Sequence, residues 1–146
     1  MTELTIIRGV SGSGKSTWGK TNYPDATQCE ADTFFVDVDG NYNFDHTQLG
    51  KAHLYCLGQA TKAILDNKDV VVANTNLKYW EFEPYLKLAS QFNYKIHIVT
   101  LNTQFENKHG VSQEVVNHMR SRMDSIETIV GMLDYSGIEF TAEEVG

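Results

Sequence analysis

Short apolar runs alternate along this chain with segments in which apolar residues recur every three or four positions. A continuous apolar run is typical of a strand covered on both faces, and the three-and-four spacing is typical of an amphipathic helix. Strands are expected at residues 4–7, 27–30, 70–73 and 95–101. Helices are expected at residues 15–21, 45–66 and 82–89 and behind Ser112. The alternation predicts an α/β fold, a three-layer sandwich with a central parallel sheet of about four strands.

Polar and proline residues predict where several helices begin. Asp45 is expected to start the second helix, and Pro84 is expected in the first turn of the third, where its missing N–H costs no hydrogen bond. Ser112 is expected to cap one last helix. The apolar face of that helix would consist of Val115, Met119, Met123, Ile126 and Val130. The polar segment 102–111 and this helix together predict a C-terminal helical lid region.

A glycine-rich segment separates the first strand from the first helix. Its sequence, GVSGSGKS, matches the phosphate-binding pattern G-x-x-x-x-G-K-[ST]. Backbone N–H groups of such a loop point at phosphate oxygens, Lys15 is expected to reach the β/γ-phosphates, and the Ser16 hydroxyl is expected to coordinate Mg²⁺. The sequence therefore predicts a P-loop fold with ATP and Mg²⁺ as cofactors. The expected nucleotide-binding residues are Gly9, Val10, Ser11, Gly12, Ser13, Gly14, Lys15, Ser16 and Thr17.

The strand at residues 70–73 helps to choose among the classes of P-loop protein. It ends in Asn74, whereas motor-type ATPases place an aspartate there. GTPases carry two further motifs, D-x-x-G and N-K-x-D. Residues 37–40 match the first, but no strand leads into them, and residues 67–69 lack the final Asp of the second and precede a strand. Mg²⁺ would then rely on Ser16, ATP and water, with Asp32 as a further candidate ligand, which suits a kinase of a small molecule or of nucleic acid.

A kinase needs a carboxylate that accepts the proton of the acceptor hydroxyl. Asp32 is the first candidate, because it follows the second expected strand at the edge where ligands bind, and Glu30 is the second. A cap of a loop or helix is the alternative role for Asp32.

Cations are also needed around the transferred phosphoryl group. The chain has three arginines, Arg8, Arg120 and Arg122, and the expected lid adds Lys108 and His109. A solvated loop is the alternative setting for Lys108 and His109, and pairing with carboxylates is the alternative role for Arg120 and Arg122.

An ordered set of short segments extends beyond the loop. The segments are residues 8–18, 32–35, 42–45, 52–53, 74–76 and 107–112. In this order they resemble the P-loop polynucleotide 5′-hydroxyl kinase family, which includes the kinase domain of the bacteriophage polynucleotide kinase-phosphatase. The resemblance covers residues 4–124. It implies transfer of the γ-phosphate of ATP to the 5′-hydroxyl of a DNA or RNA end, with Asp32 as general base and Lys15 as the phosphate-binding residue.

Three positions depart from that family, which has charged residues where this chain has Phe35, Asn74 and His109. Two other functions therefore stay open: a kinase of a small nucleoside, nucleotide or other hydroxylated metabolite, and an ATP-binding module without transfer activity. The expected substrate or lid residues are Arg8, Phe35, His53, Asn74, Asn76, Lys108, His109, Arg120 and Arg122.

Composition and charge limit the kinds of partner that the chain is expected to bind. The 146 residues predict a single domain spanning 1–146, and a net charge of −7 disfavours broad binding to duplex nucleic acid. The two cysteines suggest neither a disulfide framework nor a zinc site. No apolar stretch approaches the roughly 20 residues of a membrane helix. The sequence predicts a cytoplasmic protein without a membrane partner and predicts no oligomeric state.

Overall fold

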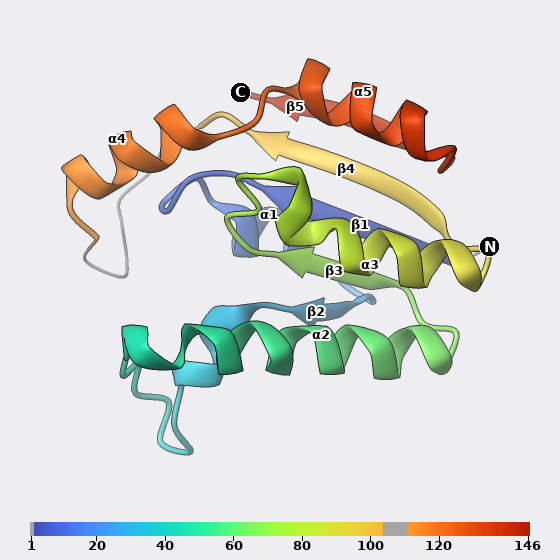
Figure 1. The fold of residues 1–146 in the computed structure, drawn as a ribbon. Helices are drawn as coiled ribbons and strands as arrows, with labels where there is room; N and C mark the ends of the chain where they lie inside the picture. Colours follow the sequence, from blue (N-terminus) through green and yellow to red (C-terminus); the bar gives the residue numbers. More distant parts are fainter. Residues whose placement is uncertain (1, 104–110) are drawn as a thin grey trace.

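The computed structural model describes residues 2–103 and 111–146. Within these residues five parallel strands form one sheet in the order β2–β3–β1–β4–β5 (Figure 1). The strands are β1 (Glu3–Arg8), β2 (Thr27–Cys29), β3 (Val70–Ala73), β4 (Lys95–Leu101) and β5 (Thr141–Val145). The α/β fold with a parallel sheet is confirmed. The fifth strand, which the sequence did not predict, adds to β4 as an edge with exposed Glu143 and Glu144.

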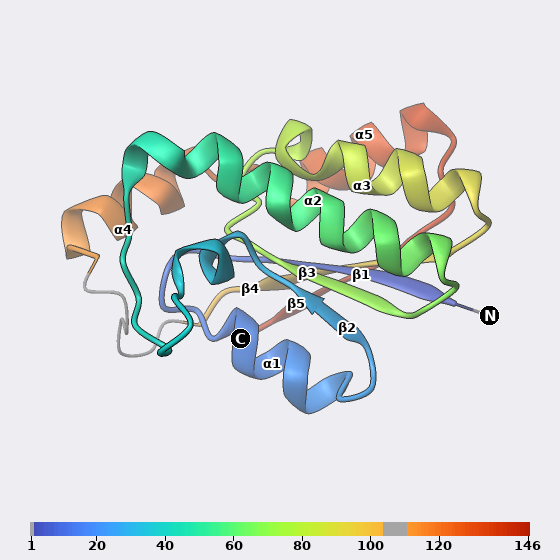
Figure 2. The same ribbon diagram turned by 90° about the horizontal axis from the view of Figure 1, so that it is seen from below.

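Helices cover both faces of the sheet, which confirms the three layers. Figure 2 shows α1 alone on one face and α2, α3 and α5 on the other, while α4 lies beyond the carboxyl ends of the strands. The helices are α1 (Lys15–Asn22), α2 (Leu49–Leu65), α3 (Tyr79–Gln91), α4 (Gln113–Arg122) and α5 (Ile126–Ser136). Short 3₁₀ turns span Ala31–Phe35 and His46–Gln48. In the described residues no helix combines the length and apolarity needed to cross a membrane.

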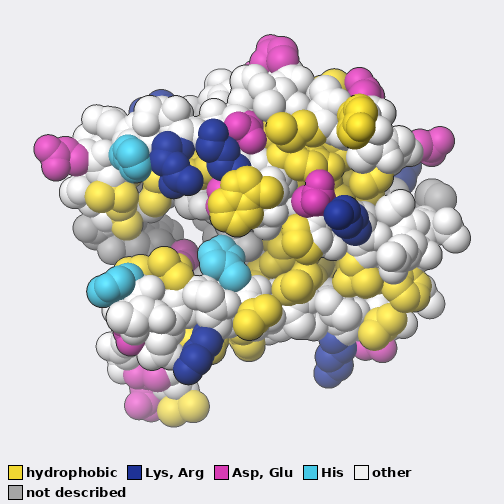
Figure 3. Space-filling view, in the orientation of Figure 1, with side chains coloured by type: hydrophobic (Ala, Val, Ile, Leu, Met, Phe, Trp, Pro, Cys, Tyr) yellow, Lys and Arg dark blue, Asp and Glu magenta, His cyan; other side chains and the backbone are white. Residues whose placement is uncertain are grey.

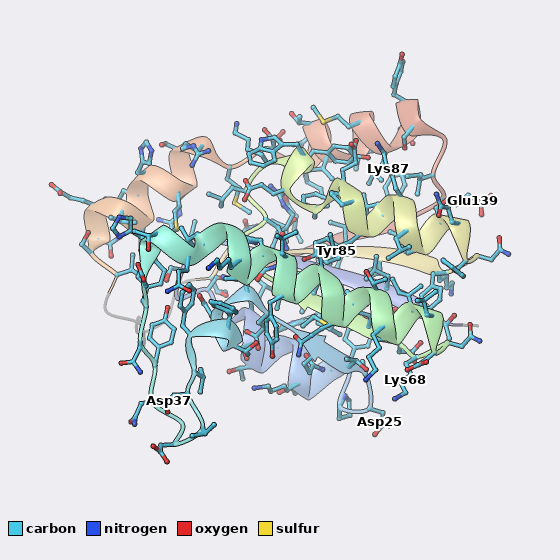
Figure 4. All side chains as sticks on the ribbon, turned by 60° about the horizontal axis from the view of Figure 1, so that its bottom comes forward. Asp25, Asp37, Lys68, Tyr85, Lys87 and Glu139 are labelled. Atoms are coloured by element: carbon cyan, nitrogen blue, oxygen red, sulfur yellow. The ribbon has the colours of Figure 1, made fainter. Side chains whose placement is uncertain are left out.

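The main core lies between the sheet and the larger helical layer. Leu4, Ile6 and Ile98 point from the strands toward this layer and are fully buried. Tyr85 lies between α2 and α3, where Figure 4 labels it, and is also buried. This core holds the strands in a fixed register, so the loops at their carboxyl ends start from a rigid base.

The single helix predicted after Ser112 is two helices in the structure, α4 and α5. α4 ends at Arg122 and α5 begins at Ile126, where Ser125 accepts a hydrogen bond from the Thr128 N–H. The chain breaks here because Asp124 is used elsewhere: its carboxylate accepts from the Tyr79 N–H at 3.0 Å, at the start of α3. The predicted apolar face is also wrong at its first position, since Val116 is buried while Val115 is 46% exposed.

Two other helix starts differ from the prediction. Asp45 caps the 3₁₀ turn through the Thr47 N–H at 3.0 Å, so α2 begins only at Leu49. α3 already begins at Tyr79, which places Pro84 beyond its first turn. The exposed surface position of Pro84 lets water serve the backbone carbonyl that its missing N–H leaves unpaired.

Gly19 brings α1 close to the sheet. A Cβ at this position would lie 3.1 Å from Ile7 Cδ1 and from Val71 Cγ1. We expect Gly19→Ala to lower the free energy of unfolding by about 1–3 kcal/mol through overpacking. Chemical denaturation measures this value. Gly58→Ala is the matched variant, because a Cβ at this helix position would meet open space. It should raise the free energy of unfolding by about 0.5–1 kcal/mol. Equal effects of the two variants would contradict the packing argument.

Candidate functional site

The glycine-rich loop joins the end of β1 to the start of α1, as the sequence predicts. Gly14 precedes the helix with a φ of 87°, in the left-handed region that favours glycine. At Gly9 a Cβ would lie 2.5 Å from Ser13 Oγ and 3.0 Å from the Leu101 carbonyl oxygen. The Gly9 N–H donates to the Thr75 carbonyl at 3.0 Å, which fixes the loop to the segment after β3. The loop therefore has the close backbone packing of a phosphate cradle.

Lys15 lies inside this loop. Its Nζ donates to the carbonyl oxygens of Gly9 and Val10, both at 3.0 Å. Burial lowers the pKa of Lys15 to about 8, although the negative charges of Asp32 and Glu30 raise it in part. The ammonium group thus occupies the centre of the cradle and is poorly solvated, which makes it ready to exchange its carbonyl partners for phosphate oxygens.

The lowered pKa of Lys15 predicts a pH dependence of nucleotide binding. In the free protein Lys15 loses its proton as the pH rises through about 8, while bound phosphates favour the ammonium form. We therefore expect ATP binding at pH 9 to take up close to one proton, and ATP affinity to fall as the pH rises above 8. Calorimetry in two buffers of different ionisation enthalpy measures the uptake. Equal heats in both buffers at pH 9 would contradict this pKa. Measurement at pH 7 serves as the control, because Lys15 is largely protonated there and the terminal phosphate of ATP is largely ionised.

Ser16 and Glu30 form the second polar pair at the loop. Ser16 Oγ donates to Glu30 Oε2 at 3.1 Å. A hydroxyl and a carboxylate are hard oxygen ligands of the kind that Mg²⁺ takes together with phosphate and water. No cluster of three or more metal-binding side chains occurs in residues 2–103 and 111–146. The pair fits a Mg²⁺ that is held largely by its nucleotide.

Asp32 lies on the 3₁₀ turn that follows β2, at the same edge of the sheet. Its carboxylate is exposed, and the Tyr42 hydroxyl donates to Asp32 Oδ1 at 3.5 Å. Asn74 holds the turn from β3, because its Oδ1 accepts from the Ala31 N–H at 2.8 Å. The effect of Asp32 on Lys15 shows that the two charges lie within electrostatic reach of one another. The structure thus places Asp32, the expected base, and Lys15, the lysine expected to bind phosphate, at one edge of the sheet.

Arg8 and Asn76 lie beneath the loop instead of facing a ligand. Asn76 is 3% exposed, has a φ of 46°, and donates to the Ile7 carbonyl at 3.1 Å. Arg8 is fully buried. Its guanidinium donates to the carbonyl oxygens of Asn76, Leu77 and Asp124 and to Thr100 Oγ1. Because these acceptors occupy it, we leave Arg8 out of the ligand-binding residues.

The other described residues of the expected substrate set lie on three elements: the 3₁₀ turn at Ala31–Phe35, α2 and α4. Figure 3 shows Lys and Arg side chains together with a histidine on the part of the surface near α4. His53 is exposed in the first turns of α2, and Arg120 and Arg122 are exposed at the end of α4. Phe35 is 5% exposed and belongs to the core. Lys108 and His109 lie outside the described residues, and the expected lid segment falls largely there as well.

Thr103 contacts the glycine-rich loop, although the sequence pointed only to the segment 102–111 that contains it. Its hydroxyl donates to the Ser13 carbonyl at 3.0 Å and so ties the end of β4 to the phosphate loop. The only signal in the sequence was its place just after a strand, at the edge where ligands bind.

Fold and loop together define a P-loop, kinase-like α/β domain. The chain belongs to the AAA domain family, which matches residues 4–108. NEDD4-binding protein 2 of Homo sapiens is 32% identical over 129 residues, and an uncharacterised protein of Pasteurella multocida is 27% identical over 138 residues. These matches cover 80% and 82% of this chain. The chain spans 7% of the length of the human relative and 75% of the bacterial one.

Solved structures share the fold at low sequence identity. A chain of the AvrRxo1-ORF1–ORF2 complex with ATP has a TM-score of 0.64 at 12% identity, covering all of this chain and 55% of its own. Kti12 of Chaetomium thermophilum in complex with ADP-AlF3 has a TM-score of 0.59 at 11% identity, covering 97% of this chain and 88% of its own. The APS kinase CysC of Mycobacterium tuberculosis has a TM-score of 0.50 at 13% identity, covering 83% and 96%. At such identities the likeness concerns the fold alone.

Proposed function

We propose that this chain is an ATP-dependent kinase that transfers the γ-phosphate of ATP to a hydroxyl group. The observation that carries the proposal is the convergence of two groups: the Lys15 ammonium in a phosphate cradle and the exposed Asp32 carboxylate beside it. A cradle alone would bind nucleotide, whereas the carboxylate adds a proton acceptor for the incoming hydroxyl. The structures of AvrRxo1 with ATP and of Kti12 with ADP-AlF3 give further support to nucleotide binding.

Each residue has a role in this proposal. The loop N–H groups and Lys15 hold the β- and γ-phosphates and stabilise the charge that develops during transfer. Ser16 and Glu30 would hold Mg²⁺, which supplies additional positive charge at the phosphates when bound. Asp32 accepts the proton of the acceptor hydroxyl while the oxygen of that hydroxyl bonds to the γ-phosphorus. Asn74 acts as a positioning residue, since it holds the backbone one residue before Asp32.

The resemblance of the sequence favours the 5′-hydroxyl of a DNA or RNA end as the acceptor. The exposed Arg120 and Arg122 on α4 would supply the cations for such a strand. A small nucleoside or other hydroxylated metabolite is the second candidate, favoured by the neutral Phe35 and Asn74 at positions that are charged in the polynucleotide kinase family.

Transfer of labelled γ-phosphate from ATP with Mg²⁺ tests the proposal. The acceptors are 5′-hydroxyl DNA and RNA oligonucleotides, nucleosides and nucleotides, each also offered to the Asp32→Asn variant. An acceptor that the wild type labels and the Asp32→Asn variant does not label supports the kinase, and that acceptor identifies the substrate. Binding of ATP without labelling of any acceptor would contradict it and favour a nucleotide-binding module.

A further inference from the structure

Three aromatic side chains form a wall beside Asp32. We define the aromatic wall as Phe35, Tyr42 and Phe44. The ring centroids of Phe35 and Phe44 are 5.1 Å apart, and the rings of Tyr42 and Phe44 lie within 12° of parallel at 6.4 Å. Phe35 is buried in the core, whereas Phe44 is 52% exposed. The wall therefore has a fixed base and an aromatic surface that solvent can reach.

A tight turn holds the wall in place. Asp37 Oδ1 accepts from the N–H groups of Asp39 and Asn41, both at 2.9 Å, and these bonds lower the pKa of Asp37. The segments on either side of the turn pair through Val36 and Tyr42. Figure 4 shows Asp37 on a loop that projects beyond the helices. An exposed loop of this kind usually gains order from its own hydrogen bonds, and here those bonds fix the position of Tyr42.

Tyr42 connects the wall to the proposed reaction centre. Its hydroxyl donates to Asp32 Oδ1 at 3.5 Å. Burial, the charge of Asp32 and this hydrogen bond raise the pKa of Tyr42 to about 12, so the hydroxyl remains a donor at neutral pH. A molecule that stacks on the wall therefore lies next to the carboxylate that would accept its proton.

The charge around the wall selects against phosphate. Residues 30–48 contain five carboxylates and neither lysine nor arginine: Glu30, Asp32, Asp37, Asp39 and Asp45. Phosphate binding in proteins relies on cations and N–H donors. The wall thus offers ring stacking to a neutral flat group, while the carboxylates of its own segment repel an anion.

We propose that the aromatic wall binds the flat ring of a neutral acceptor, a nucleoside without a phosphate group, and places its primary hydroxyl at Asp32. This assignment rests on the proposed kinase function and names its substrate class. The hydroxyl oxygen bonds to the γ-phosphorus of ATP while the bond from that phosphorus to the bridging oxygen breaks. ADP leaves, the acceptor keeps the phosphoryl group, and the hydroxyl proton passes to Asp32.

Binding of uridine tests the wall without requiring catalysis. The protein is first saturated with a non-hydrolysable ATP analogue and Mg²⁺, so that uridine cannot occupy the nucleotide site. Equilibrium dialysis then compares uridine, uridine 3′-monophosphate and ribose. We expect uridine to bind at least tenfold more tightly than either of the others. Equal or tighter binding of ribose or of the 3′-monophosphate would overturn the assignment.

Variants locate the uridine on the wall. Phe44→Leu removes one stacking surface and should weaken uridine binding about tenfold. Phe44→Tyr keeps the ring and should bind as the wild type does. Phe92→Leu removes a comparably exposed ring after α3 and is the matched control. Unchanged binding in a folded Phe44→Leu, verified by circular dichroism, would overturn the assignment.

Phosphoryl transfer separates this inference from the proposed function. If uridine binds on the wall but neither uridine nor any other acceptor is phosphorylated, the binding role of the wall is kept and the proposed kinase function is overturned. Phosphorylation of oligonucleotide ends or ring-free alcohols as efficiently as uridine, with no effect of Phe44→Leu, supports the kinase and overturns the role of the wall.

Discussion

Replacement of Lys15 by alanine is expected to lower phosphoryl transfer by about 10³-fold or more while the protein stays folded. The ammonium group is the cation at the centre of the phosphate loop, with carbonyl partners at 3.0 Å that phosphate oxygens would replace. Burial already disfavours its charge, as the lowered pKa shows, so its removal should not destabilise the fold. Transfer rates and thermal unfolding of the purified variant measure the two effects.

Lys20→Ala is the matched control for this variant. Lys20 belongs to the same helix but is exposed in its last turn. It should keep transfer and stability within the range of the wild type. Transfer by Lys15→Ala at a rate near that of the wild type would overturn both the phosphate-binding role of the loop and the proposed function.

Asp32→Asn is expected to lower kcat by about 10³-fold, within the range typical of a lost general base. Asparagine has the same shape and still accepts the hydrogen bond from Tyr42, so the geometry of the turn is kept. ATP affinity should change little, because the phosphates bind to the loop and not to this carboxylate. Steady-state kinetics with a saturating acceptor and a separate measurement of ATP binding distinguish these two quantities.

A neighbouring carboxylate controls for a general effect of charge. Asp39→Asn removes one negative charge from the exposed turn beside the aromatic wall and should leave kcat unchanged. If Asp32→Asn keeps the wild-type kcat, the base lies elsewhere, and Glu30→Gln becomes the decisive variant. Glu30 is the other carboxylate whose charge acts on Lys15.

The apolar runs predicted β1, β3 and β4 because these strands are largely buried on both faces. β2 was also expected, although Thr27 and Gln28 are only partly buried. β5 escaped prediction, since its sequence TAEEV has two exposed glutamates and gains its order from pairing with β4. The break between α4 and α5 also escaped, because apolar spacing continues across it. That break depends on Asp124, whose partners at the start of α3 are distant in sequence.

The site shows the same division between local and distant causes. The position and geometry of the glycine-rich loop could be predicted, since its glycines, Lys15 and Ser16 lie within one short segment. The role of Arg8 could not be predicted, because an arginine can bind phosphate as well as backbone carbonyls. Only the fold shows that backbone carbonyls surround its guanidinium. Asp32 and Tyr42 were each noted in the sequence, but their hydrogen bond depends on the turn at Asp37.

The burial of Arg8 has a consequence for how the nucleotide loop and α4 can move. The guanidinium lies just before the loop and binds carbonyls both after β3 and between α4 and α5. Hydrogen bonds to a charged group are worth about 1.5–3 kcal/mol each, and losing them would leave a buried charge without partners. Movement of the α4–α5 junction away from the sheet would therefore break the hydrogen bond from Arg8 to the Asp124 carbonyl, which couples that movement to the residue from which the nucleotide loop starts.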